Sequence, residues 1–229
     1  MVNREVLATI RAALKDHADA GRGAGAQAYM KSAIPSLGVR VPEVRRLTVA
    51  AVAAHPFESP HELRATVLEL WREATVREER YAAIDLTGLK MVATDLAMLP
   101  VYEEIIRTGA WWDFVDGVAP RLGVLLQAHR PAMTEVLGRW STDSDFWIRR
   151  VSITAQLKAK DQSDRRLLRE VLEANLADSE FFIRKAIGWA LREFAKTDPE
   201  WVRTFVADHG DRLSPLSRRE AVRNLPFPR

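Results

Sequence analysis

The chain has no cysteine among its 229 residues, which excludes disulfides, thiolate nucleophiles and cysteine-built zinc sites. Its five histidines have no metal-binding spacing such as H-E-x-x-H, so we expect no metal site. No run of apolar residues approaches the roughly 18 that a membrane span needs, and the first residues lack the apolar core of a signal peptide. We therefore expect a cytoplasmic protein without a membrane partner.

Lysine is scarce beside arginine. The chain has 27 arginines and 7 lysines, and its formal net charge is only +3, although its pI is about 9.4. The planar guanidinium group makes forked contacts with phosphate, so this bias is compatible with a nucleic-acid partner. A genome rich in G and C would produce the same bias, and composition leaves both explanations open.

Apolar residues recur at helical spacing along most of the chain, and strand-like alternation is rare. We therefore expect an all-α fold of helices of roughly 10 to 18 residues joined by short turns. Proline or a capping side chain marks several helix starts, and glycine marks two helix ends. The expected starts are at Pro42, Ser59–Pro60, Pro131, Ser163 and Asp198–Pro199, and the expected ends are at Gly109 and Gly210.

Three segments repeat at a fixed period in the second half of the chain. The segments AWWDFVDGV (110–118), DFWIRRVSI (145–153) and EFFIRKAIG (180–188) each begin 35 residues after the one before. A period of this length built from helix pairs is typical of an α-solenoid, in which each unit covers the apolar face of its neighbour. We expect residues 1–229 to form a single domain, an α-solenoid superhelix of HEAT-like repeats.

The first of these repeats departs from the others at Asp116. Its aromatic pair is matched by aromatic residues in the later copies, so we interpret Trp111 as a core residue. Asp116 instead stands where the later copies have Val151 and Ala186. A carboxylate at a position that the repeat fills with apolar residues is a candidate functional group.

Trp112 shares a helix face with Asp116, because residues four positions apart lie side by side on a helix. An indole beside a carboxylate suits a ligand with a flat or apolar side and a developing positive charge. Asp113 lies nearer the helix start and is interpreted as a cap or a dipole partner. Two carboxylates also suggest a metal, but no third ligand is evident.

Two residues of the later repeats are expected to face the same groove. Equivalent helices of adjacent solenoid repeats line one concave surface, which would bring Arg150 and Trp189 to the side of Trp112. Arg150 is interpreted either as a phosphate anchor or as an ordinary solvated arginine.

Four stretches resemble the AlkD family of HEAT-like-repeat alkylpurine DNA glycosylases, which are DNA alkylation repair proteins. They are YMKSAIPSLGVRVPEVRRL, WWDFVDGVAP, FWIRRVSITAQL and FFIRKAIGWALREFAKTDPEWV. The similarity runs from about Tyr29 to the end of the chain, with the WWDxVD and GWxLRE motifs in the expected order. It implies a monofunctional enzyme of the bacterial cytosol that needs no cofactor and removes cationic N3- and N7-alkylated purines from duplex DNA, without flipping the base into a pocket.

The resemblance also implies roles for individual residues. The catalytic aspartate falls on Asp116, and the two groove tryptophans match Trp112 and Trp189. The groove arginine matches Arg150, or Arg149 if the register is one residue off.

Further contacts with DNA are expected from both ends of the chain. They involve Tyr29 near the N-terminus and the basic pair Arg184 and Lys185 before Trp189. Lys185 is also the nearest amine for a lyase step, although a solvated or phosphate-facing role fits it better. Arg40 stands where the family pattern has a polar uncharged side chain, which puts the N-terminal contact in question but not the catalytic core.

The expected chemistry agrees with the residues taken alone. A cationic alkylpurine is a good leaving group, so no general acid is required. Asp116 would stabilise an oxocarbenium-like deoxyribose and orient or deprotonate the attacking water. The alternatives are a protein-binding scaffold, a nucleic-acid-binding relative without catalysis, and a glycosylase specialised for bulky adducts; in each case we expect a monomer.

Overall fold

The computed structural model describes residues 1–223 and residue 225, and within these residues every regular element is a helix. The prediction of an all-α helical-repeat fold is confirmed. The helices form two compact units, which are described separately: unit 1 is Met1–Val101, and unit 2 begins at Tyr102.

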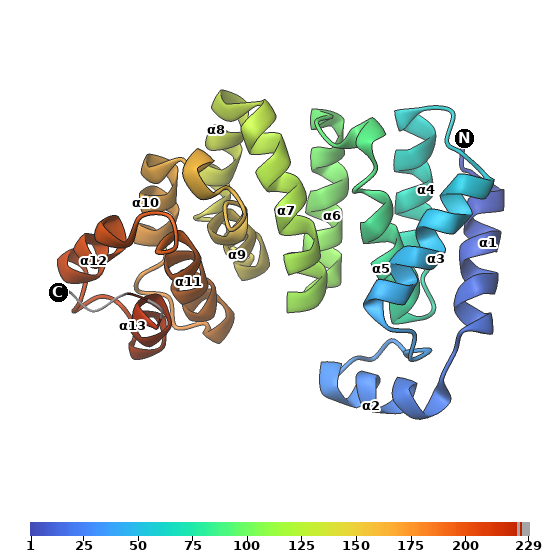
Figure 1. Ribbon diagram of the computed structural model, residues 1–229, viewed down its shortest axis with the longest axis horizontal. Helices are drawn as coiled ribbons and strands as arrows, with labels where there is room; N and C mark the ends of the chain where they lie inside the picture. Colours follow the sequence, from blue (N-terminus) through green and yellow to red (C-terminus); the bar gives the residue numbers. More distant parts are fainter. Residues whose placement is uncertain (224, 226–229) are drawn as a thin grey trace. The chain divides into compact units, whose positions relative to one another are not determined.

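Unit 1 packs four helices against one another: α1 (Arg4–Asp16), α3 (Val41–Ala54), α4 (Pro60–Arg72) and α5 (Arg77–Leu86). A fifth helix, α2 (Ala20–Met30), runs across one end of this layer (Figure 1). Two 3-10 turns, η1 (Lys90–Val92) and η2 (Leu96–Met98), lead to α6 (Leu99–Gly109), which begins in unit 1 and ends in unit 2. The core contains fully buried side chains such as Val6, Ile10, Leu63, Leu70 and Trp71.

A buried carboxylate fixes the loop between α2 and α3. Glu78 is 1% exposed, and its Oε1 accepts hydrogen bonds from Ser36 Oγ at 2.7 Å and from the Gly38 amide at 2.9 Å. Its Oε2 accepts a third from the Leu37 amide at 2.9 Å. Gly38 has φ +79°, a left-handed conformation that favours glycine. The carboxylate therefore satisfies loop donors that would otherwise be buried without partners.

Unit 2 stacks helix pairs along the chain, as expected for a helical-repeat protein. The long helix α7 packs on α8 and α9, α9 packs on α11, and α11 packs on α12 and α13. The bounds are α7 (Trp112–Ala128), α8 (Arg130–Trp140), α9 (Phe146–Thr154), η3 (Lys160–Gln162), α10 (Arg165–Glu173), α11 (Phe181–Phe194), α12 (Pro199–Asp208) and α13 (Pro215–Val222).

The repeated aromatic residues form one cluster at the starts of α7, α9 and α11. The ring of Trp111 lies 6.3 Å from that of Trp147 and 5.8 Å from that of Phe182, between ring centroids. Phe146 stacks on Phe182 with centroids 6.4 Å apart. Aromatic pairs at these distances stabilise packing beyond their buried area. Trp111 therefore has the packing role that was predicted, although it is half-buried and not a fully buried core residue.

Two glycines allow neighbouring helices of unit 2 to approach closely. A Cβ added at Gly123 on α7 would lie 2.4 Å from the carbonyl oxygen of Ala155, at the end of α9. A Cβ at Gly188 on α11 would lie 2.5 Å from the Cβ of Glu220 on α13. Both positions therefore require glycine at the present helix spacing, because the contacts involve backbone or Cβ atoms.

Most of the expected helix boundaries are confirmed. Pro42, Pro60, Pro131 and Pro199 lie in the first two positions of their helices, with Ser59 and Asp198 as capping side chains. One start was wrong: Ser163 ends η3, and the side chain that caps α10 belongs to Asp164, which accepts a hydrogen bond from the Leu167 amide. Gly109 is the last residue of α6, and Gly210 follows the end of α12.

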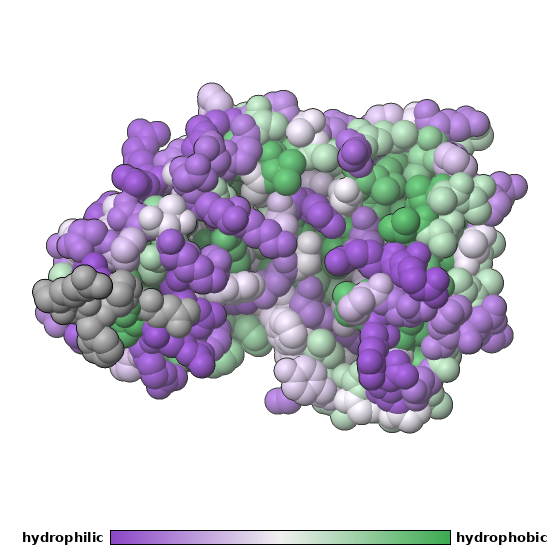
Figure 2. All heavy atoms as spheres, in the orientation of Figure 1, coloured by the Kyte–Doolittle hydropathy of each residue, from purple (hydrophilic) through white to green (hydrophobic). Residues whose placement is uncertain are grey.

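On the face shown in Figure 2, hydrophilic residues cover most of the surface, and apolar residues appear in patches between them.

Candidate active site

A pocket of about 280 Å³ lies within unit 2, where α7, the end of α9 and α11 meet. It brings together Asp116 and Pro120 from α7, Lys158 from the loop after α9, and Trp189 and Glu193 from α11. The remaining lining residues are apolar or small: Ala119, Thr154, Ala155 and Leu157. Two residues predicted from different repeats, Asp116 and Trp189, therefore share one pocket.

Arg150 holds the carboxylate of Asp116 from the side opposite solvent. Its Nε donates to Oδ1 of Asp116 at 2.8 Å and its Nη2 to Oδ2 at 2.7 Å, so the pair is bidentate. The Nη1 of Arg150 donates to the carbonyl oxygen of Phe182 at 2.6 Å, which ties the pair to α11. The Arg150 side chain is 4% exposed, and that of Asp116 is 17% exposed.

Burial raises the pKa of Asp116 above its ordinary value. The hydrogen bonds and charge of Arg150 oppose this rise, and the nearby charge of Asp113 adds to it. Desolvation disfavours the charged form of a carboxyl group, so the net effect is an Asp116 that takes up a proton more readily than an exposed aspartate. A perturbed carboxylate in a pocket is a candidate catalytic group.

Pro120 lies one helical turn after Asp116, inside α7. Proline has no amide hydrogen, so it cannot donate the helical hydrogen bond to the carbonyl oxygen four residues earlier. That oxygen belongs to Asp116, which therefore lacks its regular helical donor. Since Asp116 and Pro120 line the same pocket, both the side chain and the main chain of this residue differ from an ordinary helical aspartate.

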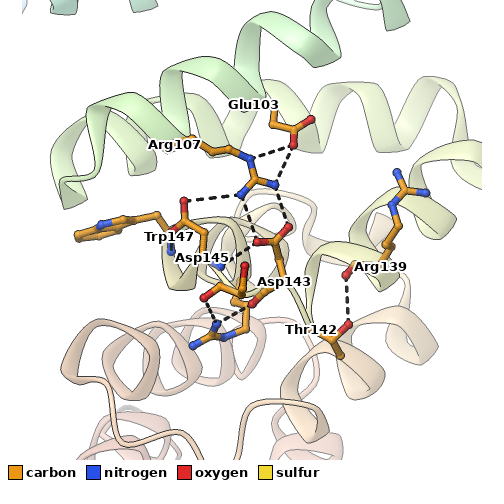
Figure 3. A network of polar contacts seen from close by, with 9 residues as sticks. Glu103, Arg107, Arg139, Thr142, Asp143, Asp145 and Trp147 are labelled. Atoms are coloured by element: carbon orange, nitrogen blue, oxygen red, sulfur yellow. Dashed lines mark hydrogen bonds and ion pairs between the residues drawn. The ribbon is translucent and has the colours of Figure 1, made fainter.

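A network centred on Arg107 fixes the start of α9, the helix that carries Arg150 (Figure 3). Arg107 on α6 donates to Oε1 of Glu103 at 3.0 and 2.8 Å and to Asp143 at 3.1 and 2.8 Å. This contact lowers the pKa of Asp143 below its ordinary value. Asp145 then caps α9 by accepting a hydrogen bond from the Trp147 amide at 2.8 Å.

Arg149 belongs to this structural network and does not contact Asp116. Its Nη1 donates to the carbonyl oxygens of Asp143 and Ser144 at 2.6 and 3.1 Å, and its Nη2 donates to Asp178 at 2.8 Å. Of the two neighbouring arginines, Arg150 is thus the one that contacts Asp116. The interpretation of Arg150 as an ordinary solvated arginine was wrong, because its side chain is buried and held by Asp116 and the Phe182 carbonyl. Its role as a phosphate anchor stays a prediction.

Trp112 and Trp189 occupy different environments. Both are half-buried, but Trp189 lines the pocket with Asp116, whereas Trp112 does not. Trp112 is the first residue of α7, one turn before Asp116 on the same helix. The expected helical neighbourhood of Trp112 and Asp116 is therefore present, and only Trp189 joins Asp116 in the pocket wall.

The basic pair before Trp189 is largely held by other groups. Lys185 Nζ lies 3.1 Å from Oε1 of Glu220, whose second carboxylate oxygen pairs with Arg192. These contacts lower the pKa of Glu220. Arg184 is half-buried, and its Nε is enclosed without a hydrogen-bond partner. Both residues lie near the start of α11, outside the pocket of Asp116.

Tyr29 and Arg40 meet at a second pocket of about 190 Å³ within unit 1. Tyr29, on α2, is 75% exposed, and Arg40 is an exposed residue at the start of α3. Arg77 lies over the ring of Tyr81 in the same pocket, with 5.7 Å between the guanidinium carbon and the ring centroid. The structure thus places the two predicted N-terminal residues together on a basic and aromatic surface.

Neither a clustered metal site nor a membrane span occurs in the part of the chain that the structure describes. Among residues 1–223 and 225, no three histidine or acidic side chains gather as metal ligands. No helix within the same residues is long and apolar enough to cross a membrane.

Seven of the nine residues that line the pocket were not predicted to lie there, among them Pro120, Lys158 and Glu193. Pro120 carried a usable signal, because a proline inside a helical pattern marks a break in the hydrogen bonding. Glu193 is the last residue of the GWxLRE motif, which pointed to this helix but not to a place in the pocket. Lys158 carried no signal, since it looks like an ordinary charged residue until the fold brings it beside Asp116.

Comparisons with known proteins agree with this geometry. A family model described as DNA alkylation repair enzyme matches residues 10–225. The chain is similar to the solved structure of a predicted DNA alkylation repair enzyme from Enterococcus faecalis, with 28% identity and a TM-score of 0.83, covering 92% of this chain and 98% of that one. No curated protein is significantly similar to the chain.

The fold is also similar to that of the alkylpurine DNA glycosylase AlkC of Pseudomonas fluorescens, which was solved bound to DNA containing an abasic-site analogue. Here the identity is 16% and the TM-score 0.53, over 96% of this chain and 61% of that one. At this identity the likeness concerns the fold alone, whereas the family model covers most of the sequence. On that match, the chain belongs to the DNA alkylation repair enzyme family.

Proposed function

We propose that this protein is a monofunctional DNA glycosylase of the AlkD type, which hydrolyses the N-glycosidic bond of cationic N3- and N7-alkylated purines in duplex DNA. The observation that carries the proposal is Asp116, a largely buried carboxylate that Arg150 holds on one side and that opens on the other into a pocket shared with Trp189. Family membership supplies the damaged-DNA context.

The reaction requires no general acid from the protein. An alkylated purine already carries positive charge, so it leaves without protonation, and the barrier lies in the oxocarbenium-like sugar and the incoming water. The carboxylate of Asp116 stabilises that cation and orients or deprotonates the water. Arg150 positions the carboxylate and favours its ionised form, because its hydrogen bonds and charge oppose the pKa rise caused by burial.

The tryptophans are proposed to contact the deoxyribose. The ring of Trp189 forms part of the pocket wall beside Asp116, so it is the closer of the two to the reacting sugar. Trp112 lies at the start of α7 and is proposed to contact the nucleotide beside the reacting one. As the resemblance to the AlkD family implies, the alkylated base is proposed to stay in the duplex stack.

Each unit is proposed to contact the DNA on its own surface. In unit 1 the contact is made by Tyr29 and Arg40, which are exposed at a basic and aromatic pocket. In unit 2, Arg149, Arg184 and Lys185 surround the starts of α9 and α11. We further propose that residues 1–229 act as one HEAT-like-repeat domain and as a monomer.

The test is to incubate the protein with methylated duplex DNA and to measure free 7-methylguanine and 3-methyladenine. Both are expected in the soluble fraction, with strand cleavage appearing only after alkali because no lyase step is involved. Duplexes with neutral lesions are expected to release little base, since no residue is assigned to protonate them. Binding of methylated DNA without any base release would instead favour a non-catalytic binding protein.

A further inference from the structure

Three of the chain's seven lysines gather around two adjoining pockets of unit 2. Lys158 lines the pocket of Asp116, and Lys160 and Lys196 line a neighbouring pocket of about 300 Å³. The two pockets have Leu157 and Glu193 in common. In a chain that uses arginine for most of its positive charge, this concentration of lysine calls for an explanation.

The segment that carries Lys158 and Lys160, residues 155–164, is held in one conformation and is named here the lysine loop. The side chain of Gln156 forms two hydrogen bonds with the backbone of Asp164, at 3.2 and 2.6 Å. The carbonyl oxygen of Gln162 accepts hydrogen bonds from Gln127 at 3.3 Å and from Arg130 at 3.0 Å. Residues of α7 and α8 therefore fix the loop from outside.

Lys160 adopts an uncommon backbone conformation within this loop. Its φ is +51°, in the left-handed region that L-residues with a Cβ seldom occupy. Asparagine or glycine would fit this conformation with less strain. A strained residue that is held by its surroundings is a candidate functional residue, and Lys160 lines one of the two pockets.

The other basic residues near Asp116 are already engaged. Arg150 is paired with Asp116, Arg149 with Asp178, and Lys185 with Glu220. Lys158 and Lys160, by contrast, are exposed, and their ammonium groups have no hydrogen bond or ion pair within residues 1–223 and 225. They are therefore available to an anionic ligand.

We propose that the lysine loop binds phosphate groups of the lesion-bearing DNA strand, beside the nucleotide at the Asp116 pocket. This inference rests on the DNA-binding part of the proposed function. In this arrangement the DNA backbone passes the C-terminal ends of α9 and α11. The residues already proposed to contact DNA in unit 2, Arg149, Arg184 and Lys185, lie near the N-terminal ends of these helices. Lysine neutralises phosphate as a point charge, and each such contact contributes to the salt dependence of binding.

A rival explanation is that these lysines only compensate the negative ends of helix dipoles, because Lys158 follows the end of α9 and Lys196 follows the end of α11. Under that explanation, removing the charges lowers the melting temperature and leaves DNA affinity unchanged. The two explanations therefore predict opposite effects on binding.

The experiment uses the full chain and a labelled duplex with an abasic-site analogue, with affinity measured by fluorescence anisotropy over a series of salt concentrations. The double variant Lys158→Gln/Lys160→Gln is expected to bind about tenfold or more weakly at low salt, with a salt slope smaller by about two. The matched control is Lys15→Gln/Lys90→Gln, which removes the same charge from exposed positions of unit 1 outside both pockets. It is expected to stay within about twofold of the unaltered protein.

The variant Lys158→Arg/Lys160→Arg is expected to restore binding, because phosphate recognition here requires charge. Affinity of the glutamine variant equal to that of the control, or a loss that arginine does not restore, would overturn the proposal. Base release by the unaltered protein is measured on the same preparations. Binding that depends on the lysines without any base release would contradict the glycosylase proposal and support the role of the lysine loop. Base release without lysine-dependent binding would support the glycosylase proposal and contradict the role of the lysine loop.

Discussion

Each unit contains a buried carboxylate beside a pocket, and the two are satisfied in different ways. Glu78 in unit 1 accepts hydrogen bonds from a hydroxyl and two backbone amides of one loop. Asp116 in unit 2 is held by a single arginine and still lines an open pocket. A carboxylate surrounded by neutral loop donors fixes structure, whereas one held from one side by a charge remains available to a ligand.

The largest effect is expected when the amide isostere replaces the carboxylate of unit 2. Asp116→Asn removes the charge that is proposed to stabilise the sugar cation and activate water, so base release should fall by about 100-fold or more. The substitution also leaves Arg150 without its charged partner, which affects folding. The rate is therefore measured in single turnover and expressed per folded, DNA-bound molecule. A rate within a few-fold of the unaltered protein would refute the role of Asp116.

The next largest effect is expected at Arg150, the charged partner that Asp116 has and Glu78 lacks. Arg150→Gln removes the group that opposes the raised pKa of Asp116, so the ionised fraction at a given pH decreases. Base release should fall by roughly tenfold near neutrality, and the acid side of the pH–rate profile should move to higher pH. A lower rate with an unshifted profile would show that Arg150 acts without changing the ionisation of Asp116.

A smaller effect is expected from the tryptophan of the pocket wall. Trp189→Ala should slow release by about fivefold, at the lower end of the 1–3 kcal/mol associated with contact to an aromatic ring. Trp112→Ala should slow it less, because Trp112 does not line the pocket of Asp116. Equal rates for the two alanine variants would contradict this assignment.

The carboxylate of unit 1 should behave in the opposite way to Asp116. Glu78→Gln places an amide against donors that now meet one acceptor oxygen, so the free energy of unfolding should fall by about 1–3 kcal/mol. Chemical denaturation of Glu78→Gln and Asp116→Asn in parallel measures the difference. Glu78→Gln should lose far less activity than Asp116→Asn, although both variants lose stability. A loss of activity in Glu78→Gln as large as in Asp116→Asn would break the comparison between the two units.

Residue patterns predicted the fold class and the central residue of the site. Asp116 was visible because it interrupts an internal repeat, and Trp189 because equivalent helices of adjacent repeats are expected to line one surface. The sequence favoured Arg150 but left Arg149 open, and the difference matters because consecutive residues on a helix differ by about 100° in direction. Only the packing of α9 against α7 and α11 turns Arg150 toward Asp116 and Arg149 toward Asp178.

Other features depend on tertiary contacts that no local pattern carries. Lys158 and Glu193 become pocket residues only when the ends of α9 and α11 come together. The predicted cap of α10, Ser163, lies one residue before the observed cap, Asp164. The side chain of Gln156 binds the backbone of Asp164, and this tertiary contact fixes the start of α10. Tertiary hydrogen bonds thus shift both the site and the helix boundaries.

The pH dependence of base release tests the central claim most directly. Single-turnover release from methylated duplex is measured from neutral to acidic pH for the unaltered protein and for Asp116→Asn, with spontaneous release from protein-free DNA subtracted. Because burial raises the pKa of Asp116 above 3.8, the unaltered protein should lose activity as the pH falls through a value higher than that of an ordinary aspartate. Asp116→Asn should be slow at every pH, and an acid limb retained in that variant would contradict the account.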